Sequence, residues 1–221
     1  HVLGLPATRR AAGRRQGRMA GVNMREIVYP FSEAAVRELR AGEAVLVSGL
    51  VFTGRDRLHK HLAEGGVAPV SLRDGAIYHC GPVAVPEGSG WRVVAAGPTT
   101  SVREEPYMAR VIAEQGVRVI IGKGGMGAAT REACARCGCV YLQAAGGAAA
   151  LLARRVRRVA GVCLLEEFGA TEALWQLEVE GLETVVGIDA RGRDLYDEVR
   201  RASSTELARL ANLQGIVTPD S

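Results

Sequence analysis

Short apolar runs of strand length alternate with amphipathic stretches of helix length along most of this chain. The apolar runs, several of them rich in β-branched residues, predict buried strands over residues 44–52, 91–96, 117–121, 140–143, 159–165 and 183–189. The amphipathic stretches between them predict helices over residues 32–40, 53–65, 101–115, 128–136, 148–155, 170–175 and 203–212. Strands and helices in alternation favour an α/β fold with a mixed central sheet.

A segment rich in glycine and proline interrupts this alternation at residues 67–90. It contains two short β-like runs, at residues 76–80 and 82–86. We therefore expect a β excursion with tight turns between the helix over residues 53–65 and the strand that begins at Trp91.

Three polar loops follow apolar runs and lead into expected helices. Each loop carries a cation: Arg55 in the first, Arg103 in the second and Lys123 in the third. In α/β folds, ligands bind beyond the carboxyl ends of the strands, where helix N-termini also present free N–H groups. Three cations that converge there would form a pocket for a small substrate with carboxylate or phosphate groups. The loops are Phe52-Thr53-Gly54-Arg55-Asp56, Gly97-Pro98-Thr99-Thr100-Ser101-Val102-Arg103 and Gly122-Lys123-Gly124-Gly125-Met126.

Hydroxyl groups in the first two loops allow two interpretations. Thr53 with Asp56, and Ser101 with Glu104, fit the spacing of capping boxes, which would place Arg55 in the first turn of its helix. The pair Thr99 and Thr100 could also cap a helix. A threonine buried beside the three cations would instead have a lowered hydroxyl pKa and could accept a proton.

The segment Gly122–Gly127 matches the G-x-G-x-x-G pattern between an expected strand and an expected helix. This pattern alone is a dinucleotide-binding fingerprint, but the acidic residue expected about 20 positions later is missing. It is not a Walker A loop, because Gly124 follows Lys123 where serine or threonine is required. A structural turn would explain the glycines and would leave the lysine unexplained.

Cysteines and histidines do not form a convincing metal site. The chain has five cysteines, and Cys134, Cys137 and Cys139 are closely spaced but have no fourth partner nearby. Free thiols are the favoured interpretation, and an odd number of cysteines with no visible export signal favours a reducing cytoplasm. His59 and His61 are two residues apart, so they do not share a helix face, and we interpret them as solvated or pairing residues.

The net charge of +4 comes from the N-terminal segment 1–25, which contains six arginines and no acidic residue. The remaining residues carry 22 basic and 24 acidic side chains, which gives no case for nucleic-acid binding. We expect residues 1–25 to be a disordered basic tail, with Met19 or Met24 as alternative translation starts. No apolar run approaches membrane-spanning length, so we also expect no membrane association.

Taken together, the loops resemble those of the β subunit of the iron–sulfur (class I) fumarate hydratase and L(+)-tartrate dehydratase family, and of the C-terminal domain of one-chain class I fumarases. Five motifs in order carry the resemblance, which covers about residues 26–200. They are Thr53-Gly54-Arg55-Asp56 with His59-Lys60, Gly97-Pro98-Thr99-Thr100-Ser101 with Arg103, Gly122-Lys123-Gly124-Gly125-Met126, Gly146-Gly147-Ala148-Ala149-Ala150, and Glu166-Glu167-Phe168-Gly169 with Glu172-Ala173 and Trp175.

The resemblance implies a swivelling β/β/α domain over residues 26–200, followed by a C-terminal helix and tail over 201–221. It implies a hydro-lyase that interconverts fumarate and L-malate and that is active only with an α subunit. That partner would ligate a [4Fe–4S] cluster whose open iron acts as a Lewis acid, and no metal would be held by this chain. A hetero-oligomer of α2β2 composition in the cytoplasm is implied as well.

The resemblance also assigns roles to residues. Arg55, Arg103 and Lys123 would bind substrate carboxylates with help from Thr100, and Thr99 would be the base that removes a proton from C3. Thr99 and Lys123 would therefore be the catalytic residues.

The sequence departs from the family pattern beside the expected site. Glu104-Glu105-Pro106 stands where Met-Asp-Pro is usual, and Ala170-Thr171 stands where Met-Pro is common. These departures leave L-tartrate or a methylated fumarate open as the substrate. A nucleotide-binding module of an oxidoreductase and a non-catalytic interaction domain are the alternatives from other classes.

Overall fold

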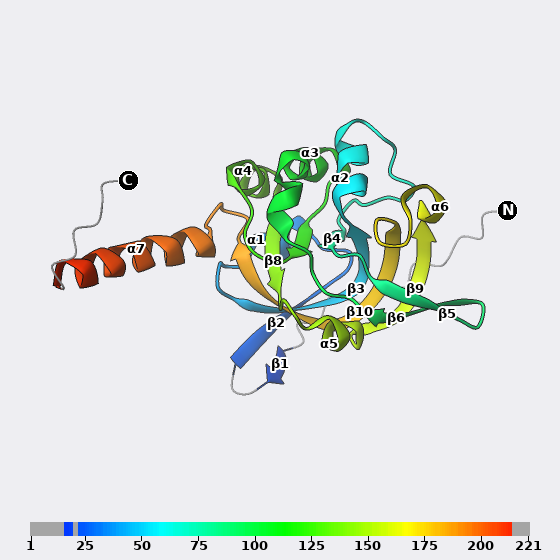
Figure 1. Cartoon of the computed structure of the whole chain (residues 1–221), viewed down its shortest axis with the longest axis horizontal. Coiled ribbons are helices and arrows are strands. Elements are labelled where there is room, and N and C mark those ends of the chain that lie inside the picture. The colour runs from blue at the N-terminus through cyan, green and yellow to red at the C-terminus, as the bar shows by residue number, and fades with distance from the viewer. Residues whose placement is uncertain (1–15, 20–21, 214–221) are drawn as a thin grey trace.

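The computed structural model describes residues 16–19 and 22–213 and has the expected mixed α/β fold (Figure 1). Its strands are β1 (Gln16–Met19), β2 (Val22–Val28), β3 (Ala44–Gly54), β4 (Ala76–His79), β5 (Val83–Glu87), β6 (Gly90–Ala95), β7 (Val119–Gly122), β8 (Val140–Ala144), β9 (Val156–Cys163) and β10 (Leu174–Ile188). Its helices are α1 (Glu33–Arg37), α2 (Asp56–Ala63), the 3-10 helix η1 (Ser101–Glu104), α3 (Glu105–Gln115), α4 (Ala128–Cys137), α5 (Ala149–Ala153), α6 (Leu165–Phe168) and α7 (Leu195–Leu213).

Eight strands form the main sheet in the order β1-β2-β3-β4-β7-β8-β10-β9. Strands β2, β3, β4, β7 and β8 run parallel to one another, whereas β1 is antiparallel to β2 and β10 is antiparallel to β8, β9 and β3. Because β10 pairs with both β8 and β3, the central part of the sheet closes on itself like a barrel. Strands β5 and β6 form a separate two-stranded sheet. The expected β excursion is therefore confirmed for β5 only: β4 lies in the middle of the main sheet, and β6, expected as a strand of the main sheet, pairs outside it.

Alternate residues of the central strands face two separate apolar cores. Val119 and Ile121 of β7 belong to one core, and Ile120 between them belongs to the other. Helices α2, α3 and α4 lie side by side against the second core, at the top of Figure 1, whereas α5 packs near β6 on the opposite side. Trp175, expected to fill the core, is fully buried. Both faces of the central strands are covered, which explains why these strands are continuous apolar stretches in the sequence.

Most expected elements are confirmed, with one exception. Helix α1 begins after Ser32, whose hydroxyl accepts from the Ala35 N–H, and α3 ends where Gly116 adopts a left-handed conformation. The helix expected over 170–175 is wrong: a turn occupies this segment and strand β10 begins at Leu174. The alternation of apolar and polar residues after Leu174 follows a period of two, which indicates a strand.

The two ends of the described chain differ from the expected boundaries. Residues 16–19 and 22–25, assigned above to the basic tail, lie in strands β1 and β2, which pair antiparallel. Residues 1–15 and 20–21 lie outside the described residues, so the expected disorder stays a prediction there. Helix α7 begins earlier than expected and extends away from the sheet (Figure 1). No described helix is both long enough and apolar enough to span a membrane.

Candidate active site

The three polar loops meet at the carboxyl ends of neighbouring parallel strands. Strand β4 pairs in parallel with β3 on one side and with β7 on the other, so the loops after β3 and β7 flank the end of β4. The second loop joins this edge through backbone contacts. Thr100 forms a parallel bridge with Lys123, and the Ser101 N–H donates to the Lys123 carbonyl at 2.9 Å. The fold thus brings together the segments that carry all five candidate residues. We call Arg55, Thr99, Thr100, Arg103 and Lys123 the rim.

Arg55 lies at the start of α2. It is the N-cap residue with an extended backbone, not a residue of the first turn as expected. Its Nε atom is 3.5 Å from the Glu172 carboxylate, and its side chain is largely buried. The capping box expected for Thr53 is also wrong. The Thr53 hydroxyl donates to the Ala173 carbonyl at 3.2 Å and accepts from the Trp175 N–H at 3.0 Å, so it joins β3 to the start of β10.

Arg103 and the two threonines lie on the second loop. The Arg103 guanidinium forms an ion pair with the Asp56 carboxylate, which ties this loop to the start of α2. The Thr99 N–H donates to the His79 carbonyl at 2.7 Å, and Thr99 is half-buried whereas Thr100 is exposed. Loop two therefore contacts both the end of β4 and the start of α2.

Lys123 differs from the two arginines in its surroundings. Arg55 and Arg103 each have a carboxylate nearby, whereas no carboxylate of a described residue lies within ion-pair distance of the Lys123 ammonium. Its side chain is half-buried and passes Gly146, where an added Cβ would lie 3.0 Å from the Lys123 Cδ. A half-buried cation without a protein counter-charge is suited to bind an anionic ligand.

A group of buried polar side chains lies directly beneath the rim, and sequence reasoning missed most of it. We call His59, His79, Ser101, Glu104 and Tyr141 the polar floor, and each of them is less than 1% exposed. Ser101 is not a helix cap: its hydroxyl lies 2.9 Å from His79 Nδ1 and accepts from the Lys123 N–H at 3.1 Å. The N-cap of η1 is Thr100, without a side-chain hydrogen bond.

His59 and Glu104 complete the floor. His59 is fully buried and fits the pairing alternative: its Nδ1 is 2.8 Å from the Arg55 carbonyl oxygen and 3.4 Å from the Glu104 carboxylate. Burial lowers the pKa of His59 to about 4, against a hydrogen bond to Arg55 that raises it. Burial raises the pKa of Glu104 to about 7, with Asp56 adding to this effect.

His79 sits at the end of β4 and its ring packs edge-on against that of His59, with the centroids 4.9 Å apart. Burial, and secondarily His59, lower the pKa of His79 well below its usual range. Both imidazoles are therefore neutral at pH 7. The signal that could have found His79 is a polar residue at the carboxyl end of an otherwise apolar strand, Ala76–His79.

The glycine-rich motif leads into α4, as expected, but the helix N-terminus is already occupied. The Glu105 carboxylate accepts from the Gly127 N–H at 2.7 Å and from the Thr130 N–H at 3.2 Å. The Thr130 hydroxyl donates to it as well, at 2.6 Å. A carboxylate at this position takes the place that a pyrophosphate would need, so the structure disfavours a dinucleotide here.

The closely spaced cysteines Cys134, Cys137 and Cys139 lie on α4 and just after it, whereas Cys80 directly follows His79 of the polar floor. Cys134 and Cys139 are buried, Cys137 is half-buried, and all three are free thiols. Within residues 16–19 and 22–213, no group of three or more His, Cys, Asp or Glu side chains is placed to hold a metal ion. The side chains of these described residues therefore do not fit an iron–sulfur cluster.

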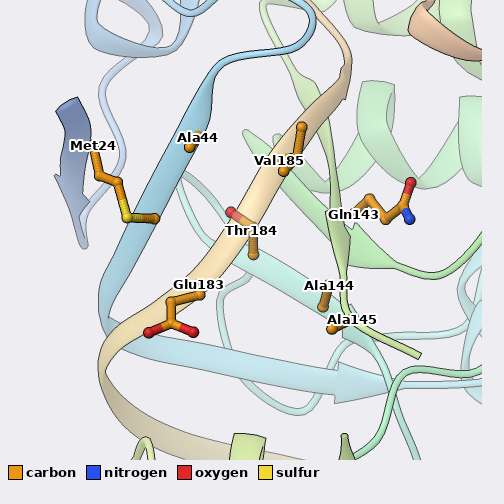
Figure 2. A pocket seen from close by; sticks show the side chains of 8 residues that line it. All are labelled: Met24, Ala44, Gln143, Ala144, Ala145, Glu183, Thr184 and Val185. Atoms are coloured by element: carbon orange, nitrogen blue, oxygen red, sulfur yellow. The ribbon is translucent and has the colours of Figure 1, made fainter. Parts of the chain in front are cut away.

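A pocket of about 520 Å³ lies between strands β3, β8 and β10 (Figure 2). Its one acidic lining residue, Glu183, is ion-paired with Arg155, and its Gln143 side chain hydrogen-bonds the Tyr196 hydroxyl. The lining contains no cation, so the pocket does not suit a dicarboxylate as the rim does. It is formed by Met24, Ala44, Gln143, Ala144, Ala145, Glu183, Thr184 and Val185.

Comparison with known proteins gives consistent matches. The sequence model of the family described as Fumarase C-terminus matches residues 5–199. A Geobacillus stearothermophilus protein named "Putative fumarate hydratase class I" is 45% identical over 181 residues, which are 81% of this chain and 35% of the relative. This chain therefore spans about a third of that relative's length.

Two relatives are matched over most of their own length. A Methanocaldococcus jannaschii protein named "Putative L(+)-tartrate dehydratase subunit beta" is 36% identical over 193 residues, 84% of this chain and 99% of the relative. The Escherichia coli protein named "L(+)-tartrate dehydratase subunit beta" is 33% identical over 177 residues, 79% of this chain and 88% of the relative.

Proposed function

We propose that this chain, which belongs to the Fumarase C-terminus family, is the β subunit of a hydro-lyase that interconverts fumarate and L-malate. The observation that carries the proposal is the rim. Three cations and two threonines come from loops that meet at the ends of β3, β4 and β7, and Lys123 has no carboxylate partner among the described residues. A small dicarboxylate has the charge and size that such a rim can hold.

The reaction gives each rim residue a task. Loss of water from L-malate removes a proton from C3 and hydroxide from C2, and leaves the double bond of fumarate. We assign proton removal at C3 to the Thr99 hydroxyl, and we assign the carboxylates to Arg55, Arg103 and Thr100. Negative charge builds up beside a carboxylate as the proton leaves, and the fixed Lys123 ammonium would stabilise it. Hydration of fumarate would follow the same steps in reverse.

The proposal includes a partner. The relatives named as β subunits support an α subunit and a hetero-oligomer, for which we propose α2β2 composition. We assign the [4Fe–4S] cluster to that partner, because the cysteines of this chain are not arranged to ligate one. When bound, the cluster would supply a Lewis acid for the leaving hydroxyl. Free thiols are compatible with the reducing cytoplasm in which we place the complex.

Dependence on the partner can be tested directly. The purified chain, the cluster-loaded α subunit and their mixture are assayed anaerobically with fumarate and L-malate. We expect turnover from the mixture only, and we expect oxygen to abolish it. Hydratase activity from the purified chain alone would contradict the proposal.

L(+)-tartrate is the second candidate substrate, because two matched relatives carry tartrate dehydratase names. The departures at Glu104 and Glu105 do not decide between the substrates: Glu105 caps α4 and Glu104 is buried in the floor. The same assay with L-tartrate separates the two, since a higher kcat/KM for tartrate would change the substrate and keep the reaction class. Thermal stabilisation by NAD(P), without stabilisation by malate, would support the nucleotide-binding alternative instead.

A further inference from the structure

We propose that His79 and Ser101 are positioning residues that fix the place of Lys123 relative to Thr99, and that His59 extends this arrangement to Arg55. The inference rests on the proposed function for its activity test, but its structural part concerns the chain alone. The three loops of the rim come from distant parts of the sequence. Side chains of the buried polar floor form hydrogen bonds to all three of them.

His79 contacts the second loop at two points. Its carbonyl accepts from the Thr99 N–H at 2.7 Å, and its ring Nδ1 lies 2.9 Å from the Ser101 hydroxyl. One residue at the end of β4 thus fixes both the expected base and the residue two positions later. Because β4 lies between β3 and β7, His79 is anchored in the middle of the site.

Ser101 connects His79 to Lys123 through two hydrogen bonds to the Lys123 backbone. The Ser101 N–H donates to the Lys123 carbonyl at 2.9 Å, and the Ser101 hydroxyl accepts from the Lys123 N–H at 3.1 Å. The backbone of Lys123 is therefore held from both sides by a single residue. Tyr141, whose hydroxyl is 2.7 Å from the Gly124 carbonyl and 3.1 Å from the Ser101 hydroxyl, holds the next turn of the same loop.

The hydroxyl proton of Ser101 can take one of two hydrogen-bonding directions. A carbonyl can only accept, so the Tyr141 proton goes to Gly124. The Ser101 proton can then point to Tyr141, with His79 donating from Nδ1, or to His79 Nδ1. Either arrangement satisfies the buried Ser101 hydroxyl, and in both of them Nδ1 of His79 is one of its hydrogen-bond partners.

His59 connects the first loop to this arrangement. Its Nδ1 donates to the Arg55 carbonyl at 2.8 Å, and its ring packs edge-on against the His79 ring. At least one of the two rings must be neutral, since two imidazolium groups with centroids 4.9 Å apart in a buried site would repel each other. Because the two rings are in contact and are bonded to the loops, a shift of one histidine would displace Arg55, Thr99 and Lys123.

An apolar floor of the same shape would be easier to bury. His59 Nε2, His79 Nε2 and both Glu104 oxygens are buried with no hydrogen-bond partner among the described residues, which costs free energy. The atoms that do have partners bind the loops that carry the rim. Positioning of the rim accounts for retaining polar groups where packing alone would favour leucine or phenylalanine.

A matched pair of variants tests the inference. His79→Asn keeps an amide near the Nδ1 position and can still bond Ser101, whereas His79→Leu has no polar atom there. In the complex with the α subunit, we expect His79→Leu to lower kcat/KM for malate by about 100-fold, the scale of a small misplacement of catalytic groups. We expect His79→Asn to stay within about tenfold of the wild type.

Amide hydrogen exchange on the full chain provides a readout that does not need the reaction. His79→Leu and Ser101→Ala should both accelerate exchange of the Lys123 N–H by at least about tenfold relative to buried amides of β7, and His79→Asn should not. Ser101→Ala removes the hydroxyl without adding volume, so it remains informative if His79→Leu fails to fold.

The outcomes separate this inference from the proposed function. Equal losses for Asn and Leu at position 79, or unchanged Lys123 exchange in Ser101→Ala, would overturn the positioning role. A wild-type complex that turns over no dicarboxylate would refute the proposed function, and the exchange result would still decide the structural claim.

Discussion

The rim and the polar floor differ in almost every physical property, although His59, Ser101 and Glu104 of the floor each lie within four positions of a rim residue. The rim carries three cations and is partly exposed: the Arg55 side chain is 21% exposed and that of Arg103 49%, so water can screen the ion pair of Arg103. The floor is inaccessible, its histidines are neutral, and its contacts are with the backbone of the loops. The residues proposed to bind the substrate are therefore distinct from the residues that position them. Rim variants should lose activity and keep stability, whereas floor variants should change both.

The largest effect should come from crowding the floor. A Cβ at Gly122 would lie 1.8 Å from the Ser101 hydroxyl and 3.1 Å from His79 Nδ1, so Gly122→Ala must displace Ser101. We expect a loss of more than about 3 kcal/mol in the free energy of unfolding, measured by denaturant titration. Gly90→Ala is the control, because its Cβ would approach no atom closer than 4.0 Å. Equal stability of the two variants would mean that the floor is not tightly packed.

A rim variant should separate affinity from stability. Arg55→Ala removes a cation of the first loop, and we expect KM for malate in the complex to rise at least about tenfold, the loss of one charge-assisted contact. Arg57→Ala is the matched control. That side chain is two residues away, lies over the Phe168 ring and donates to the Phe168 carbonyl, so it is turned away from the rim. Similar KM values for both variants would remove Arg55 from the binding site.

Glu104 gives the floor a characteristic pH dependence. Its pKa is about 7 in the folded chain, above its ordinary value of 4.5, so the folded state holds the proton more tightly. This contribution to stability is complete below about pH 4.5 and is lost as the pH rises through 7. Glu104→Gln cannot lose a proton. The variant should therefore gain about 1–3 kcal/mol relative to the wild type between pH 4.5 and pH 8.

Parallel denaturant titrations of the two proteins check this prediction. His59, whose pKa of about 4 lies below its ordinary 6.5, loses its contribution as the pH falls from 6.5 through 4. That opposite trend occurs in both proteins and cancels in the difference. A constant difference across the pH range would contradict the burial-raised pKa of Glu104.

The smallest effect should come from an ion pair remote from both regions. Arg157 and Glu180 pair at 2.7 Å between β9 and β10, but their side chains are 58% and 66% exposed. Arg157→Ala should change the free energy of unfolding by less than about 0.5 kcal/mol and leave kcat/KM unchanged. A clear loss of kcat/KM in Arg157→Ala would show that the outer strands of the sheet contribute to the site.

Sequence reasoning located the rim well because its signals are local. In each loop a glycine and a cation follow an apolar run within seven residues. Parallel strands β3 and β7 then bring two of these loops to one edge of the sheet. The strand over Ala44–Phe52 and the helix start at Ser32 were predictable for the same reason. The roles of all five rim residues, Arg55, Thr99, Thr100, Arg103 and Lys123, stay predictions, since their placement alone does not establish chemistry.

The floor could not be predicted, because its contacts join positions far apart in sequence. Ser101 with Glu104 has the spacing of a capping box, yet the packing of η1 turns Ser101 towards His79 and Glu104 towards His59. Thr53 is likewise used across the sheet by β10. Local pattern rules assign short polar side chains to the nearest helix end, whereas a closed sheet offers them distant backbone partners.

The most direct test of the central claim is the kcat/KM of Lys123→Ala in the cluster-loaded complex, with Lys60→Ala as control. Lys60 is another lysine, on α2, with a 58% exposed side chain, and pairs with Glu64 one turn later. Our account predicts a loss of at least about 100-fold for Lys123→Ala, as for removal of one preorganised charge-stabilising group, and unchanged thermal stability. Lys60→Ala should match the wild type. A near-wild-type kcat/KM for Lys123→Ala would reduce Lys123 to a turn residue and contradict the account.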